Sequence, residues 1–288
     1  MSQTKPFIRI TGILAAFMTA ALLCLAPITA KAEDGSPIGV AVCVAKKTMN
    51  LRSEPSAKAS VVAKLPAKTF VKVYAQSDKW YLVDFNGALA WGDSSTLVFA
   101  AIPAATVMST GADRAYTLYY QGSPEWKFSR SVKKKACVMS SYAIMINNMG
   151  IPANPRFIYE SNRRNTSINS NCLTANFGVR EVCALIADSP YLRSFDRGKT
   201  YVVDPKNNGV AAIKQAIDLH PEGVLCYFKK GSKAHAIVAC KYDGDTIYYS
   251  DAGRDKGTLI AFEDTWVSYK HRLTYAHLNY MIALDYVA

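Results

Sequence analysis

Histidine is scarce in this chain, and the short motifs that bind metals are missing. Only four histidines occur in 288 residues, with no Cys-x-x-Cys or His-x-x-x-His pair. Those spacings supply the ligands of structural zinc sites, so the sequence predicts no metal and no cofactor. No basic block is interleaved with aromatic residues either, which argues against nucleic acid as a partner.

Long apolar runs are also missing, with a single exception at residues 10–25. This run follows two basic residues and precedes the small-residue triplet Ala30-Lys31-Ala32, which is the order of a secretory signal peptide. We expect residues 1–32 to be removed by cleavage after Ala32. An uncleaved anchor and a lipid on Cys24 are the alternatives. No later segment could span a bilayer, so no stable membrane span is expected after cleavage.

Acidic residues are outnumbered, since 34 Lys and Arg face 22 Asp and Glu in the full chain. Removal of the leader leaves 31 basic against 22 acidic residues, a net charge of about +9. Outside a bacterial cell, this charge suits an anionic wall or membrane surface. Solubility alone is the alternative explanation.

Six cysteines remain after cleavage of the leader. Cys226 and Cys240 lie inside apolar, strand-like runs, so we predict that they are buried thiols. Cys172 and Cys183 flank a polar stretch that leads into a helix, and they either form a disulfide or stay reduced.

Residues 41–98 have the pattern of a small all-β barrel. Short segments with alternating apolar residues at 61–65, 70–74 and 80–85 are separated by turn residues such as Asn86-Gly87. We therefore predict a first domain that contains only strands.

This stretch resembles the bacterial SH3 domain family through Asn50-Leu51-Arg52-Ser53, Trp80-Tyr81 and Ala90-Trp91. The resemblance implies a non-catalytic targeting module that holds a hydrolase to cell-wall peptide. A barrel that merely packs on its neighbour is the alternative, because Trp80 and Trp91 could both be core residues. Three positions depart from the family pattern and concern the turns: Lys68, Ala90 and Gly92.

We expect a connector at residues 99–123 that packs on a second domain at 124–288. The second domain opens with a helix that is apolar on nearly every face from Val138 to Met149 and that Gly150 and Pro152 terminate. Such a helix belongs inside a domain.

Cys137 stands at the first turn of this predicted helix, directly after Lys133-Lys134-Lys135 and Ala136. Unpaired backbone N–H groups and the helix dipole favour a thiolate there, and the lysines add positive potential. Cys137 is therefore the candidate nucleophile.

His235 is the candidate base, because it begins an apolar strand that turns through Asp243-Gly244-Asp245 into a second strand ending at Asp251. A three-residue loop places Ile237 opposite Asp251, so that His235 and Asp251 share one face of the hairpin. Asp251 would then orient the imidazole. A two-residue loop would put them on opposite faces.

The order of these residues resembles that of the papain-like cysteine peptidases, in particular the C39-like branch. The matching positions are Cys137, His235-Ala236-Ile237-Val238, Asp243-Gly244 and Asp251-Ala252. The resemblance implies an α+β peptidase domain in which the helix that starts at Cys137 packs against an antiparallel sheet. The last stretch of the chain, from residue 261 onward, matches no motif.

One departure concerns the oxyanion hole, because Ser131 stands where the family usually has a glutamine. Gln121 could take this place only if the intervening loop folds back; otherwise the Cys137 backbone N–H acts with another donor, or the site is degenerate. Two hypotheses follow. The chain is either an exported cysteine hydrolase that cleaves amide bonds in cell-wall peptide or secreted protein, or a catalytically inactive wall-binding or adhesion protein.

Overall fold

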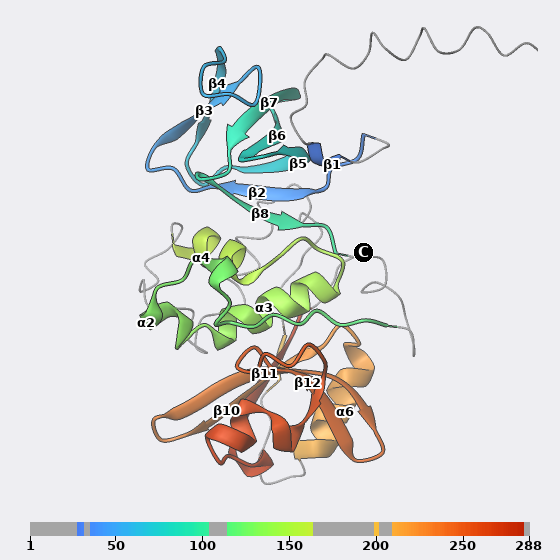
Figure 1. The fold of residues 1–288 in the computed structure, drawn as a ribbon. Coiled ribbons are helices and arrows are strands. Elements are labelled where there is room, and N and C mark those ends of the chain that lie inside the picture. Colours follow the sequence, from blue (N-terminus) through green and yellow to red (C-terminus); the bar gives the residue numbers. More distant parts are fainter. Residues whose placement is uncertain (1–27, 32–34, 104–113, 164–198, 202–208, 285–288) are drawn as a thin grey trace, which may run out of the picture.

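The computed structural model describes residues 28–31, 35–103, 114–163, 199–201 and 209–284. Within this part of the chain, two antiparallel sheets form two domains, and a layer of helices lies between the sheets (Figure 1). The first domain is built from strands, whereas the second combines helices with its sheet. The architecture is a β-rich, SH3-like domain followed by an α+β domain.

The first domain consists of strands, and more and less buried residues alternate along β3 and β5. Their order in the sheet is β4-β3-β7-β6-β5-β2-β8, and β1 pairs with β5. Leu51, Val73 and Val83 are fully buried in a core that belongs to this domain. The strands are β1 (Ile28–Lys31), β2 (Gly39–Cys43), β3 (Thr48–Arg52), β4 (Val61–Pro66), β5 (Phe70–Ser77), β6 (Trp80–Phe85), β7 (Ala88–Asp93) and β8 (Leu97–Ala101).

Strand β1 lies inside the predicted leader, so cleavage after Ala32 would remove it together with its pairing to β5. Residues 1–27, which hold the apolar run of the leader, lie outside the described residues. No helix in the described ranges is long and apolar enough to cross a membrane.

Two departures from the SH3 family pattern have visible structural consequences. Lys68 has φ = 69°, the left-handed region in which glycine has no steric cost, so a lysine is strained there. At Gly92, a Cβ atom would lie 2.8 Å from Leu97 Cδ1 and 2.9 Å from Met49 Cε. Because the core closes tightly at this position, a larger residue would require its neighbours to move.

The second domain is a six-stranded antiparallel sheet with helices on both faces. The strand order is β13-β12-β11-β10-β14-β9. Helix α3 lies on one face and α6 on the other, over separate cores, and α4 packs on α3 and on β2 and β8 of the first domain. The main elements are α2 (Arg130–Lys133), α3 (Cys137–Asn148), α4 (Pro155–Arg163), β9 (Lys199–Tyr201), α6 (Gly209–Leu219), β10 (Val224–Lys230), β11 (Lys233–Asp243), β12 (Thr246–Ser250), β13 (Ile260–Ala261) and β14 (Leu278–Ala283).

Helix α3 is buried on all sides, as its sequence predicts, with eleven of its twelve residues buried. The sheet of the second domain covers one side of α3. The first domain reaches the same core from the opposite side, through Val40 and Val42 of β2 and Ala100 of β8. A helix without a polar face is stable here because neither side meets water.

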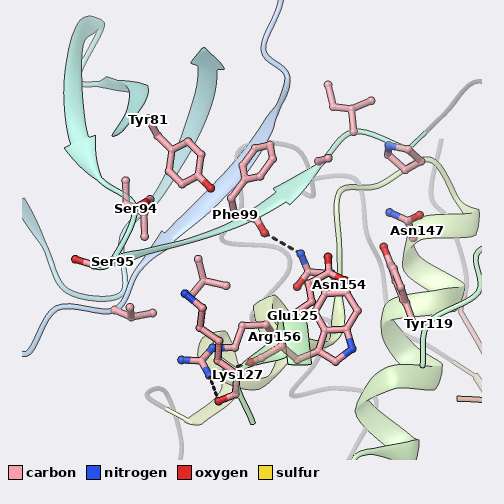
Figure 2. Close-up of a pocket in the computed structure, with 17 residues that line it drawn as sticks. Tyr81, Ser94, Ser95, Phe99, Tyr119, Glu125, Lys127, Asn147, Asn154 and Arg156 are labelled. Carbon is pink, nitrogen blue, oxygen red and sulfur yellow. Dashed lines mark hydrogen bonds between the residues drawn. The ribbon is translucent and has the colours of Figure 1, made fainter. Parts of the chain in front are cut away.

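The two domains also meet through α4, where the rings of Phe70 and Phe157 lie 5.7 Å apart. Asn154 Nδ2 donates to the Phe99 carbonyl at 2.7 Å, and beside this bond is a cavity of about 510 Å³ (Figure 2). Asn147, near the C-terminal end of α3, is part of its wall. Because ten residues of helix span about 15 Å, this cavity is distinct from the space around Cys137.

The described part of the predicted connector lies along the second domain. The Tyr116 hydroxyl donates to the Cys240 carbonyl at 2.8 Å, and Ser250 Oγ donates to the Thr117 carbonyl at 2.9 Å. Residues 114–123 therefore extend over α3 and bring Gln121 toward the end of the helix that carries Cys137.

Candidate active site

Cys137 is the first residue of α3 and is partly exposed. The N-cap residue, Ala136, has no side chain that could bond the free N–H groups of the first turn. Those groups and the positive end of the helix dipole are therefore available to an anion. The helix begins at Cys137, where the sequence predicts its start, and this position favours a thiolate.

The hairpin that carries His235 and Asp251 differs from the three-residue loop that we expected. Asp243 pairs with Thr246, so the loop contains only Gly244 and Asp245. Gly244 has φ = 52°, the conformation that short hairpin loops require and that glycine adopts at little cost. The expected loop length was wrong.

A β-bulge at residues 239–241 corrects the register that the shorter loop would impose. The pairing shifts there by one residue, so that Val238 pairs with Ser250. This is the register expected from a three-residue loop, and it puts His235 and Asp251 on the same side of the hairpin. An extra residue in the middle of β11 thus compensates for the missing residue in the loop.

The structure brings His235 and Asp251 into direct contact. His235 Nε2 and Asp251 Oδ1 lie 2.7 Å apart, and the two side chains are 4% and 0% exposed. Asp251 accepts two further hydrogen bonds, from Gly253 N at 2.8 Å to Oδ1 and from Trp266 N at 2.5 Å to Oδ2. The carboxylate is therefore held from three directions.

The imidazole of His235 also bonds the Cys137 thiol, and because Nε2 is engaged by Asp251, the nitrogen left for sulfur is Nδ1. Burial by itself raises the pKa of Cys137. The hydrogen bond and charge of His235, together with the Ala236 and Val138 backbone N–H groups, outweigh it and leave the pKa below its ordinary value.

Burial alone would lower the pKa of His235, but the Asp251 carboxylate and the Cys137 sulfur raise it to about 10. A lowered thiol pKa beside a raised imidazole pKa favours a thiolate–imidazolium pair at neutral pH.

Two other thiols of the second domain have the opposite environment. Cys226 and Cys240 are completely buried, as predicted. Burial raises the pKa of Cys226 well above the ordinary range and that of Cys240 to about 12. Cys172 and Cys183, the candidate disulfide pair, lie outside the described residues.

Of the two residues considered for the oxyanion hole, Ser131 points to solvent and Gln121 lies near the site. Ser131 is exposed on α2, where its hydroxyl lies 3.0 Å from that of Ser129. The chain before α2 does fold back: Gln121 N donates to the Ala252 carbonyl, and Gln121 Nε2 donates to the Lys133 carbonyl, both at 2.8 Å. Gln121 therefore lies between the loop after Asp251 and the segment before Cys137.

Sequence reasoning missed several residues around this site, and two of them, Trp266 and Tyr280, lie in the stretch without a recognised motif. Trp266 binds Asp251 through a backbone N–H, which no side-chain pattern reveals. The rings of Tyr227 of β10 and Tyr280 of β14 stack with their centres 4.9 Å apart. Burial, and to a smaller extent the charge of Cys137, raises the pKa of both tyrosines. The one usable signal was the glycine two residues after Asp251; the structure gives the reason for it, because a Cβ atom at Gly253 would lie 2.9 Å from His235 Nε2.

Metal-ligating side chains are not grouped in the part of the chain that the structure describes. The described residues contain no group of three His, Cys, Asp or Glu side chains that could hold a metal ion. The ring of His271 lies 6.2 Å from that of His235, and burial together with the nearby His235 charge lowers the pKa of His271.

Comparison with known proteins identifies the first domain. Residues 47–98 match the family model of the bacterial SH3 domain. None of the curated proteins matches the chain.

Among solved structures, NlpC2 and NlpC1 from Trichomonas vaginalis are each 12% identical with a TM-score of 0.20. The matches cover 77% of this chain and 70% and 66% of theirs. An NlpC/P60 family protein from Bacillus cereus ATCC 10987 is 15% identical with a TM-score of 0.23, covering 88% of this chain and 65% of that one. The chain thus spans about two thirds of the length of these proteins. TM-scores this low carry no information about the function of the second domain. Residues 47–98 are a bacterial SH3 domain.

Proposed function

We propose that the chain is an exported cysteine hydrolase that cleaves amide bonds in cell-wall peptide or secreted protein. The observation that carries this proposal is the Cys137–His235–Asp251 arrangement: a thiol of lowered pKa at a helix N-terminus, bonded to an imidazole that a buried carboxylate holds at 2.7 Å. In this proposal the second domain is a papain-like, C39-like peptidase domain.

The roles of the three residues follow from their contacts. The Cys137 thiolate attacks the peptide carbonyl carbon, and the resulting tetrahedral intermediate collapses when the His235 imidazolium protonates the leaving amine. The neutral imidazole then takes a proton from water, which attacks the thioester and releases the acid. Asp251 touches only the imidazole, so its role is to orient the ring and stabilise its charge.

The oxyanion of the intermediate needs hydrogen-bond donors in a fixed place. The uncapped first turn of α3 supplies the Cys137 backbone N–H. We assign the second donor to Gln121: one hydrogen of its side-chain amide is used by the Lys133 carbonyl, and the other remains available.

The SH3 domain supports a cell-wall substrate, because the resemblance implies a module that binds wall peptide. The excess of basic residues suits an anionic wall surface. In this proposal the mature protein is secreted or wall-associated, and it needs no cofactor.

Substitution of the three residues tests the proposal on the purified protein. We expect Cys137→Ala and His235→Ala to abolish turnover of wall-derived peptides. Asp251→Asn should leave a reduced but measurable rate, because nucleophile, base and oxyanion donors remain. Circular dichroism verifies that each variant is folded.

Matched controls come from the same chain. Cys240→Ala removes a buried thiol, and His277→Ala removes a half-buried imidazole that caps a short turn by accepting from Thr274 N. Both variants should keep the parent rate. Full activity of Cys137→Ala would exclude the cysteine mechanism. A parent that binds wall peptide but cleaves no substrate would identify the inactive wall-binding protein instead.

A further inference from the structure

Arg254 lies three residues after Asp251, in a turn next to the candidate active site. Arg254 N donates to the Asp251 carbonyl at 2.9 Å, which closes a turn. The preceding residue, Gly253, borders the His235 ring so tightly that a Cβ atom there would lie 2.9 Å from Nε2. Arg254 therefore directly follows the residue that contacts the His235 imidazole.

A tyrosine holds the guanidinium of Arg254 in place. The guanidinium carbon lies 4.6 Å from the centre of the Tyr269 ring, and Tyr269 is 55% exposed. Tyr269 belongs to the π-helical turn η4 (Trp266–Lys270), whose first residue donates to Asp251 Oδ2. Both members of the stacked pair are thus tied to Asp251, and stacking fixes the plane of the guanidinium.

No acid neutralises this cation within the described part of the chain. Arg254 forms no salt bridge there, and its Nε atom is buried without an acceptor. A guanidinium normally fills such donors with a carboxylate or carbonyl oxygen. The structure therefore presents an ordered cation whose usual partner is missing.

A cavity of about 50 Å³ lies beside Arg254, between residues 118–120 and the loop at 250–260. Lys256 also lines it; the acids there are Asp255, which is exposed, and Asp251, which already accepts three hydrogen bonds. The cavity is small, so it suits a single planar group rather than a whole side chain.

We propose that Arg254, ordered by Tyr269, binds a carboxylate of the substrate, so that the site selects acidic peptides. This inference rests on the proposed function and names the substrate class. The carboxylate belongs either to an acidic side chain near the scissile bond or to the C-terminus of the peptide. Arg254 touches the substrate away from the reacting carbonyl and determines specificity.

Binding to Cys137→Ala protein tests the inference without requiring turnover. The probes are short peptides that carry a carboxylate in the side chain or at the C-terminus, each paired with the corresponding carboxamide, and calorimetry gives each Kd. One carboxylate position should bind on the order of 10- to 100-fold more tightly than its amide, because a hydrogen-bonded charge pair is lost in the amide. The position that shows the difference identifies the source of the carboxylate.

Arg254→Gln in the Cys137→Ala protein should remove this preference, because it weakens binding of the acid peptide and leaves binding of the amide peptide unchanged. Tyr269→Phe should keep the preference, since the ring remains, and Tyr269→Leu should reduce it. Arg272→Gln is the matched control, because it removes an exposed positive charge three residues from Tyr269 and should leave the preference intact.

In the catalytically competent enzyme, Arg254→Gln should raise KM for the acid peptide, whereas kcat and the turnover of the amide peptide should stay unchanged. Equal binding of acids and amides, or a preference that survives Arg254→Gln, overturns the inference. Acid-selective binding by a parent that cleaves no peptide would uphold the inference and reject the proposed hydrolase.

Discussion

At the scale of single residues, the chemistry depends on two linked pKa changes. The pKa of Cys137 lies below its ordinary value and that of His235 is raised to about 10. The reactive form has a deprotonated thiol and a protonated imidazole. At low pH this form is lost when the sulfur is protonated, which happens below the ordinary thiol pKa. At high pH it is lost near pH 10, when the imidazolium releases its proton.

Alkylation with iodoacetamide makes this prediction measurable without a substrate. Cys137 should react much faster than Cys226 and Cys240 at pH 7, and its rate should change little between pH 7 and 9, where an ordinary thiol accelerates strongly. In the His235→Ala variant the rate should fall at pH 7 and rise with pH as for an ordinary thiol. Mass spectrometry assigns the labelled residue, and a uniform slow reaction of all three thiols would contradict the proposed ion pair.

At the scale of elements, α3 combines a structural and a chemical role. Its interior residues are completely buried between the two sheets, which leaves the helix no freedom to shift. Fixed packing therefore holds Cys137 against His235, and a loss of packing in α3 should act on stability and on the site together.

Ile144→Ala should lower the free energy of unfolding by about 2–5 kcal/mol, because it leaves a cavity in a fully buried helix. The matched control is Leu219→Ala in α6, where the side chain is 64% exposed and a change within about 0.5 kcal/mol is expected. Urea unfolding followed by circular dichroism gives both values. Equal effects of the two substitutions would show that α3 is not packed as described.

At the scale of the whole molecule, the first domain helps to support the second through residues of strands β2 and β8 that flank the SH3 match at residues 47–98. Val40, Val42 and Ala100 share a core with α3, and Asn154 bonds the Phe99 carbonyl across the boundary. Packing does not exclude the targeting role: one face of this domain packs on α3 and α4, whereas Val61, Val62 and Leu89 on other strands are exposed.

Such an interface predicts that the two domains unfold together. Scanning calorimetry of the purified protein should show one transition, and Phe157→Ala in α4 should lower its midpoint because a ring buried against Phe70 is lost. Leu89→Ala on the exposed surface of β7 should leave the midpoint unchanged. Two separate transitions, with only one moved by Phe157→Ala, would show that the domains are independent.

Local pattern alone was enough to locate several elements of this protein. Alternation of apolar residues indicated β4 to β6, and the largely apolar sequence from Val138 to Met149 indicated a buried helix with Cys137 at its start. These properties are visible in a sequence because they depend on neighbours two to four residues apart.

Only the tertiary structure decided how the candidate site is assembled. The bulge at residues 239–241 sets the register that joins His235 to Asp251, yet an extra residue in a strand carries no distinctive side chain. The Trp266 backbone N–H, the return of Gln121 to the segment before Cys137 and the stacking of Arg254 on Tyr269 are contacts between segments far apart in sequence. Such contacts follow from the packing of the whole chain, so no short stretch of sequence contains them.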